Sequence, residues 1–174
     1  MKILINGGCG FLGSNLASYG IENGHAITVL DNMSRLGSDR NREWLQTLGD
    51  FTFLHGDTRN KNDMENVIKE GQFDAVFHLA GQVTMTKSII DPYKDFEVNA
   101  MGAMNLLDSI RQTCSNRDKF FCSPLNGFIE NLQRKFNIGI KYIVIQDIFP
   151  AIIASHIKHI IKWCVLGGGI YGIN

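Results

Sequence analysis

The residues best suited to chemistry are the glycines of segment 6–13, which reads NGGCGFLG. They give the spacing G-x-G-x-x-G (Gly8, Gly10, Gly13) and an overlapping G-x-x-G-x-x-G that begins at Gly7. Glycine lets a backbone turn tightly and approach a phosphate, and the amides at the start of a following helix then face the anion. We predict that this loop binds the diphosphate of a dinucleotide. Its predicted contact residues are Gly7, Gly8, Gly10, Phe11, Leu12 and Gly13.

An acidic residue follows the second predicted strand, where a dinucleotide-binding site needs a group that binds the ribose. Asp31 follows the second apolar run, after the glycine loop. Its carboxylate can accept hydrogen bonds from a ribose diol and would repel a 2′-phosphate, which favours NAD over NADP. Arg35 lies nearby and keeps NADP as an alternative. The structural alternative is a tight turn that binds no ligand.

Further polar and small residues follow the later strands. Asp57 ends the third strand, where it could contact adenine or cap a loop. Ala80 and Gly81 would let a cofactor lie close to the backbone, whereas His78 is better read as a satisfied strand residue than as a base. Asn99 could fix a neighbouring backbone segment, approach the cofactor or be solvated. These positions add Asn32, Asp57, Thr58, Leu79, Ala80, Gly81, Gln82 and Asn99 to the predicted cofactor-binding set.

The elements that must position these residues alternate between strands and helices. Strands are predicted over 3–6, 26–30, 51–55, 75–79 and 119–122, and helices over 11–19, 40–48, 63–69 and 91–111. Met64, Val67 and Ile68 share one face of their helix, and Phe96 is expected on the apolar face of the long one. This alternation predicts an α/β fold with a Rossmann-like, doubly wound parallel sheet of five or six strands.

Composition limits the function classes. The chain has 174 residues, a length typical of one domain, and 17 basic residues balance 17 acidic ones. No basic excess points to a nucleic acid or an anionic membrane. The 4 cysteines form no C-x-x-C pair, so no metal site is predicted. The first apolar run is too short for a signal peptide, and no apolar run reaches ~18 residues, so a cytoplasmic protein is expected.

The sequence changes character near residues 119–126, and isoleucine, lysine and asparagine become dense after Phe136. We therefore predict a dinucleotide-binding core over 1–126 and an atypical tail over 127–174. The tail's periodicity fits a helix over 128–136, a sixth strand over 140–145 and a last helix over 152–164. Two origins fit this tail: internal loss of a segment, or out-of-frame translation.

Residues 1–118 resemble the N-terminal part of extended short-chain dehydrogenase/reductase enzymes of the NAD-dependent epimerase/dehydratase group. The resemblance rests on the glycine loop, Asp31-Asn32, Gly56-Asp57, His78-Leu79-Ala80-Gly81 and the run from Asn99 to Leu107. It implies a redox-neutral epimerisation of a nucleotide-sugar, in which NAD takes up a hydride and returns it to the other face. Finer matches at 31–35, 55–63 and 78–88 point to the branch that acts on CDP-sugars at sugar carbon 2, for O-antigen lipopolysaccharide.

The chain departs from that family at the catalytic residues. The family uses Tyr-x-x-x-Lys, and none of the 4 tyrosines here has a lysine four positions later. The family's serine or threonine falls on Pro124, with Ser123 as the neighbouring catalytic candidate. The C-terminal substrate lobe is expected to be missing, and one of two family dimerisation helices is damaged, so a dimer is left open. We expect NAD binding with little or no turnover; the alternatives are a non-catalytic dinucleotide-binding module or another nucleotide-sugar epimerase or dehydratase.

Overall fold

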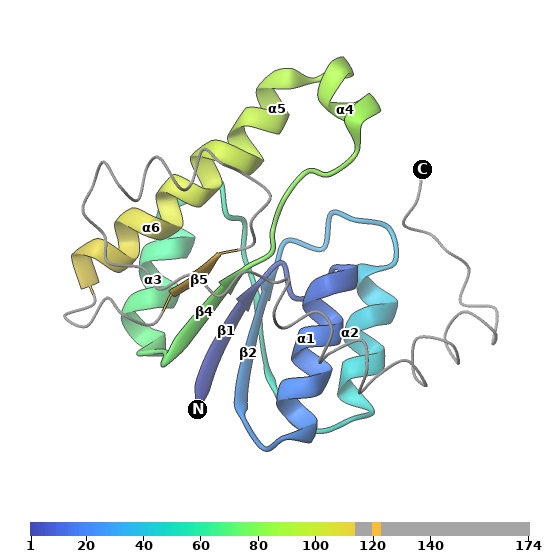
Figure 1. The fold of residues 1–174 in the computed structure, drawn as a ribbon, viewed down its shortest axis with the longest axis vertical. Helices are drawn as coiled ribbons and strands as arrows, with labels where there is room; N and C mark the ends of the chain where they lie inside the picture. The colour runs from blue at the N-terminus through green and yellow to red at the C-terminus, as the bar shows by residue number, and fades with distance from the viewer. Residues whose placement is uncertain (114–119, 123–174) are drawn as a thin grey trace.

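A five-stranded parallel sheet forms the centre of the molecule. The computed structural model describes residues 1–113 and 120–122, and the strands lie in the order β3-β2-β1-β4-β5 (Figure 1). Their bounds are β1 Lys2–Asn6, β2 Ala26–Asp31, β3 Thr52–His55, β4 Ala75–His78 and β5 Phe120–Cys122. The order reverses between β1 and β4, so the carboxyl end of β1 is the switch point at which such sheets bind ligands.

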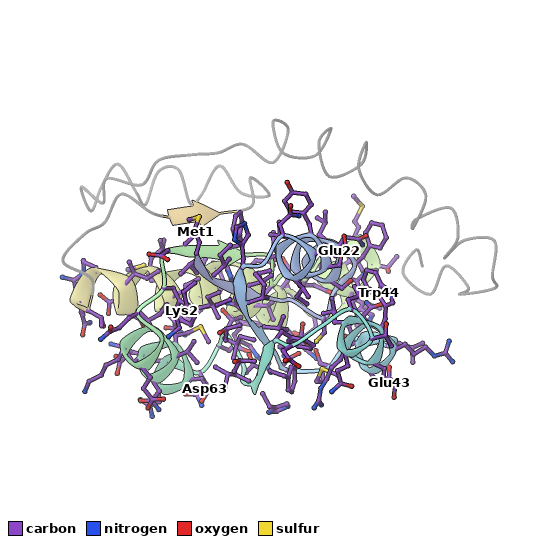
Figure 2. The ribbon with its side chains drawn as sticks, turned by 90° about the horizontal axis from the view of Figure 1, so that it is seen from below. Met1, Lys2, Glu22, Glu43, Trp44 and Asp63 are labelled. Atoms are coloured by element: carbon purple, nitrogen blue, oxygen red, sulfur yellow. The ribbon has the colours of Figure 1, made fainter. Side chains whose placement is uncertain are left out.

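Helices cover both faces of the sheet because β1 is apolar on both sides. Ile3 and Ile5 pack with residues of α1 (Phe11–Glu22) and α2 (Ser38–Gln46), whereas Leu4 packs with α3 (Lys61–Gly71) and α6 (Gly102–Thr113). Alternate residues of a strand point to opposite faces, so each face receives its own apolar cluster. Figure 2 shows the two helical layers, with Trp44 on α2 and Asp63 on α3 on opposite sides of the sheet.

The predicted fold class is confirmed, and every predicted strand within the described residues is present. The helices over 11–19, 40–48 and 63–69 correspond to α1, α2 and α3, which the structure extends or shifts by a few residues. Met64 and Ile68 are buried as predicted. The elements predicted over 128–136, 140–145 and 152–164 lie outside the described residues.

The segment after β4 differs from the prediction. The sequence predicted one helix over 91–111, but a short α4 (Met85–Ile90) precedes it and α5 (Pro92–Phe96) starts one residue later. Asp91 adopts φ −135° and ψ 79° and its side chain accepts a hydrogen bond from the Lys94 amide, so it caps the helix instead of joining it. Phe96 is 55% exposed, so its predicted place on the apolar face was wrong.

A π-helical turn interrupts that helix. The turn η1 (Glu97–Met101) joins α5 to α6, and Glu97 and Gly102 at its borders both keep right-handed helical angles. Residues 92–113 therefore form one continuous helix with a single wide turn, as the ribbon from α5 to α6 shows (Figure 1). Single π-turns inside α-helices are frequent at functional sites.

Candidate dinucleotide-binding site

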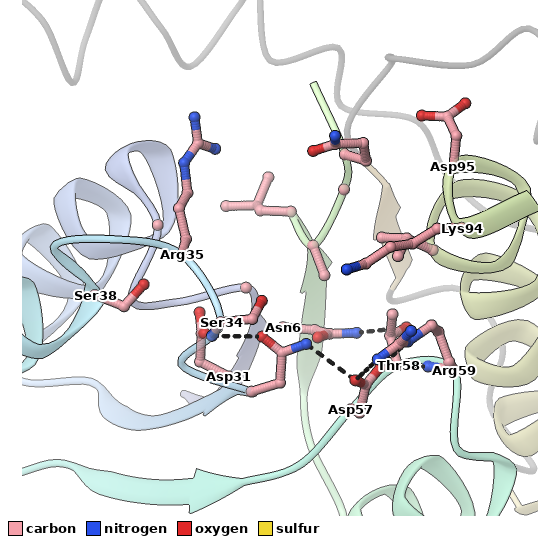
Figure 3. Close-up of a pocket in the computed structure, with 18 of the residues that line it drawn as sticks. Asn6, Asp31, Ser34, Arg35, Ser38, Asp57, Thr58, Arg59, Lys94 and Asp95 are labelled. Atoms are coloured by element: carbon pink, nitrogen blue, oxygen red, sulfur yellow. Dashed lines mark hydrogen bonds and ion pairs between the residues drawn. The ribbon is translucent and has the colours of Figure 1, made fainter. Parts of the chain in front are cut away.

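A cleft of about 370 Å³ opens at the carboxyl ends of β1, β2, β3 and β4. The loops that follow the strands form its floor, and Lys94 and Asp95 of α5 lie on one side (Figure 3). Lys87 and Ile90 of α4 also line the cleft. Ten of the predicted cofactor-binding residues line it: Gly7, Gly10, Asp31, Asn32, Asp57, Thr58, Leu79, Ala80, Gly81 and Gln82. The fold thus brings together residues that are up to 75 positions apart, from Gly7 to Gln82. They meet at the carboxyl ends of the strands, where parallel sheets of this kind bind ligands.

The glycine loop is held against its neighbours so tightly that side chains are excluded. Gly7 has φ +82°, and a Cβ there would lie 2.7 Å from the Cα of Ala80. A Cβ on Gly13 would lie 2.6 Å from the Cα of Gly8 and overlap the carbonyl of Gly7. Gly8 packs on Val29, away from the cleft. The loop therefore needs glycine both for its left-handed turn and for the close approach of α1 to β1.

The start of α1 lacks a cap of its own. Gly10 occupies the N-cap position without a side chain, and the first turn contains no acidic residue. The Ser14 amide makes the first bond of the helix, to the Gly10 carbonyl at 2.9 Å. The amides of Phe11, Leu12 and Gly13 precede it and have no intrahelical acceptor, which is the arrangement that attracts an anion.

Asp31 connects the end of β2 to the glycine loop. Its Oδ2 accepts a hydrogen bond from the Cys9 amide at 2.9 Å, and its Oδ1 accepts one from the Met33 amide at 2.9 Å. Asp31 is 9% exposed and lines the cleft. A carboxylate oxygen can accept a second hydrogen bond, so each oxygen retains capacity toward a ligand.

Asp57 is held by Arg59 and Asn32. Arg59 forms a bidentate pair with its carboxylate, at 3.0 Å from Nε and 2.7 Å from the terminal nitrogen, and Asn32 Nδ2 donates to Oδ2 at 3.0 Å (Figure 3). These hydrogen bonds, chiefly those of the Arg59 side chain, hold the pKa of Asp57 well below its usual range. The Arg59 amide also donates to Asp57. Of the two roles predicted for Asp57, adenine contact or loop cap, the geometry seen here is that of a loop cap.

His78 is a buried neutral side chain, as expected of a satisfied strand residue. Its Nδ1 lies 3.0 Å from Nδ2 of Asn6, a donor, so the imidazole carries its proton on Nε2. Burial lowers the pKa of His78 to about 4. Asn6 Nδ2 also lies 3.4 Å from Oγ1 of Thr58. Asn6 thereby links the ends of β1, β4 and the loop after β3.

Asn99 lies behind the cleft instead of lining it. Its Oδ1 accepts a hydrogen bond from the Gln82 amide at 2.8 Å, and its Nδ2 donates to the Gln82 carbonyl at 3.0 Å. Of the roles left open for Asn99, the geometry supports fixing a neighbouring backbone segment.

Several lining residues had not been predicted. Asn6, Gly56 and Arg59 adjoin predicted positions. Including one or two more residues on either side of each predicted position would have found them. Lys87 and Lys94 come from α4 and α5, and Lys94 extends from its helix into the cleft (Figure 3). No motif marks them, because they reach the site only through the fold of the segment after β4.

The glycine loop also contains a cysteine. The Cys9 thiol is buried, and burial followed by the nearby Asp31 charge raises its pKa to about 12. Within 1–113 and 120–122, no group of three histidine, cysteine, aspartate or glutamate side chains could hold a metal ion. No helix in these ranges is long and apolar enough to cross a membrane. The catalytic candidate Ser123 lies outside the described residues.

A parallel sheet in this order, with a glycine loop at its switch point and an acidic residue ending β2, defines a Rossmann-like dinucleotide-binding fold. The model of the GDP-mannose 4,6 dehydratase family matches residues 4–123. The chain belongs to this family, within the NAD-dependent epimerase/dehydratase group.

Individual relatives are nucleotide-sugar epimerases. The chain is 50% identical over 137 residues to CDP-paratose 2-epimerase of Salmonella typhi, covering 79% of this chain and 40% of the relative. It is also similar to the UDP-Glc/GlcNAc 4-epimerase of Campylobacter jejuni, with TM-score 0.64, 33% identity, and coverage of 70% of this chain and 36% of that one. The UDP-glucose 4-epimerase of Thermus thermophilus, solved with NAD, has TM-score 0.67, 26% identity and coverage of 82% and 53%. The chain thus spans about two fifths of the length of the Salmonella relative.

Proposed function

We propose that the chain is the NAD-binding part of a nucleotide-sugar epimerase and that it binds NAD in the cleft described above. The observation that carries this proposal is the uncapped start of α1, directly after the glycine loop and at the switch point of the sheet. The amides of Phe11, Leu12 and Gly13, together with the positive end of this 12-residue helix, would then bind the diphosphate. The relative from Thermus thermophilus, solved with NAD, supports the choice of cofactor.

The residues of the cleft fit such a cofactor. Gly7 and Gly10 line the cleft and carry no side chain, so a diphosphate can approach the backbone there. In this proposal Asp31 would accept hydrogen bonds from the adenosine ribose diol, and Asp57 and Thr58 would contact the adenine. The loop 79–82 would then support the nicotinamide half. Arg35, which keeps NADP as an alternative cofactor, also lines the cleft. A comparison of NADP binding with NAD binding therefore tests whether Asp31 selects NAD.

The substrate proposed is a CDP-linked sugar, supported by the 50% identity to the Salmonella epimerase. When bound, NAD would accept a hydride from the sugar and return it. The residues described here would hold and orient the cofactor. The 174 residues contain no Tyr-x-x-x-Lys, so we expect little or no epimerisation by this chain, and Ser123 stays a prediction.

Calorimetric titration of the purified full chain with NAD and NADP tests the binding. We expect saturable NAD binding that exceeds NADP binding, and a cooperative thermal transition that rises with NAD. A ligand at 100 times its Kd should stabilise the folded state by about 2.7 kcal/mol. A cooperatively folded sample without NAD binding would refute the proposal. Steady epimerisation of CDP-paratose would refute the expected inactivity.

The absence of the Tyr-x-x-x-Lys pair favours a second candidate function, a non-catalytic module that binds the dinucleotide and acts through a partner. This candidate predicts an assembly that depends on NAD. Light scattering with and without NAD, followed by NAD-dependent capture and identification of a partner, tests it. A strictly monomeric chain with no NAD-dependent partner would exclude it.

A further inference from the structure

Lys94 brings a positive charge into the cleft that no described residue neutralises. Its side chain extends from α5 into the cleft and lines it (Figure 3). Within residues 1–113 and 120–122, its ammonium forms no ion pair and no hydrogen bond. The Arg59 guanidinium, by contrast, is paired with Asp57 and Glu97. The ammonium of Lys94 therefore has its N–H donors available for a ligand.

The helix that carries Lys94 fixes which end of the cleft it serves. Glu97 Oε2 lies 3.7 Å from Nη1 of Arg59, in the loop after β3. Residues three apart in a helix share a face, so Lys94 lies on the side of its helix that meets Arg59. Figure 3 shows Lys94 at the same end of the cleft as Thr58 and Arg59. The proposed function assigns this end to the adenine, and the diphosphate to the amides at the start of α1.

The carboxylate at this end has no lone pair to spare. Asp57 Oδ1 accepts from the amide and from Nε of Arg59, at 2.9 and 3.0 Å. Its Oδ2 accepts from Nη2 of Arg59 at 2.7 Å and from Nδ2 of Asn32 at 3.0 Å. A carboxylate has about four sites that accept hydrogen bonds, and here all are taken. Asp57 can therefore border the base, but it is poorly suited to accept from the amino group of adenine.

We propose that Lys94 selects the base of the cofactor, by donating a hydrogen bond to an acceptor on the edge of a purine. In adenine the acceptors on that edge are the ring nitrogens N1 and N7. This inference rests on the proposed NAD site and names a residue that recognises its base. Since the free group at this end is a donor, the 6-amino group of adenine is not required. A 6-oxopurine, which presents a further acceptor, should bind as well.

Titration of the full chain with NAD and with nicotinamide hypoxanthine dinucleotide tests the base selection. We expect the two affinities to agree within about threefold, and Lys94→Met to lower both by about fivefold or more. Lys94→Arg keeps a charged donor and should bind as the unaltered chain does. Lys69→Met is the matched control, because Lys69 is exposed near the end of α3 and does not line the cleft. Hypoxanthine dinucleotide binding that is weaker than NAD binding by about tenfold would overturn the inference, because one lost hydrogen bond to a charged group has that effect.

Adenosine separates a contact with the base from a contact with the phosphates. In Lys94→Met, adenosine affinity should fall by the same factor as NAD affinity, and nicotinamide mononucleotide affinity should not change. Weakened NAD binding with unchanged adenosine binding would overturn the inference, because Lys94 would then act on the diphosphate. The comparison of the two dinucleotides uses the unaltered chain, so it does not depend on the folding of a variant.

The same titrations distinguish this inference from the proposed function. If Lys94→Met binds NAD and adenosine as the unaltered chain does, the role of Lys94 is overturned and the NAD site stands. If the unaltered chain binds adenosine in a manner that depends on Lys94 but binds no NAD, the proposed function is overturned and the role of Lys94 stands. A folded chain that binds neither ligand would overturn both.

Discussion

The Asp31 carboxylate accepts a hydrogen bond from the Cys9 amide at 2.9 Å, so the acidic residue that ends β2 is joined directly to the glycine loop after β1. The side chain proposed to bind the ribose therefore also orders the loop proposed to bind the diphosphate. A substitution at this position acts on both.

The Asp31→Asn variant tests that dual role. The amide side chain loses the charge and can no longer accept from both backbone amides, so NAD affinity should fall by about 10- to 100-fold, since a hydrogen bond to a charged group contributes about 1.5–3 kcal/mol. NADP affinity should fall less, because repulsion of the 2′-phosphate is removed. Titration with both cofactors gives the ratio. The exposed Asp50→Asn is the control, and an unchanged NAD to NADP ratio would contradict the assignment.

The two glycines at the start of α1 should respond differently to a methyl group. Gly13→Ala places a Cβ 2.6 Å from the Gly8 Cα, so the helix must move and unfolding should become easier by about 1–3 kcal/mol. Gly10→Ala meets only the Gly7 carbonyl oxygen, at 3.2 Å, and lines the cleft, so its main effect should be weaker NAD binding. Denaturant unfolding and NAD titration of both variants check this. An equal loss of stability in the two variants would contradict the tighter packing described at Gly13.

Buried His78 should make the fold sensitive to acid. Its pKa is about 4 when folded, against 6.5 for the unperturbed group, so the unfolded state binds the proton first. Stability should be unaffected above pH 6.5, decrease as the pH falls toward 4, and lose on the order of 3 kcal/mol over that window. His78→Gln, which can still accept from Asn6, should flatten this part of the profile. Urea unfolding at a series of pH values measures it; a variant with the wild-type slope would place the acid sensitivity elsewhere.

The Cys9 thiol should be inert in the folded chain. Burial raises its pKa to about 12, so almost no thiolate is present at neutral pH. Alkylation with iodoacetamide, followed by mass spectrometry of the peptide that contains Cys9, should show labelling only after denaturation. NAD should slow the labelling further if it stabilises the fold. Rapid modification under native conditions would mean that the glycine loop opens readily.

The parts of the fold that local patterns encode were predictable. Short apolar runs followed by glycine or aspartate predicted β1 to β4. The position of Asp31 and Asp57 at the ends of two of these strands predicted that both would line the cleft. The helix α5 falls within the predicted helix over 91–111, but α4 was not predicted, because this short helix has no buried residue and so no apolar periodicity. The π-turn was not predicted either, and neither were the hydrogen bonds that Asn99 within it and Asn105 after it make with loops distant in sequence.

Asn105 donates to the carbonyls of Thr58 and Arg59, across more than forty positions of sequence. During synthesis on the ribosome, β1, β2 and β3 emerge well before that donor does. The two carbonyls must therefore remain hydrated until residue 105 has left the exit tunnel. The adenosine end of the proposed pocket is consequently completed late, and a nascent chain halted before that residue should not yet retain the nucleotide.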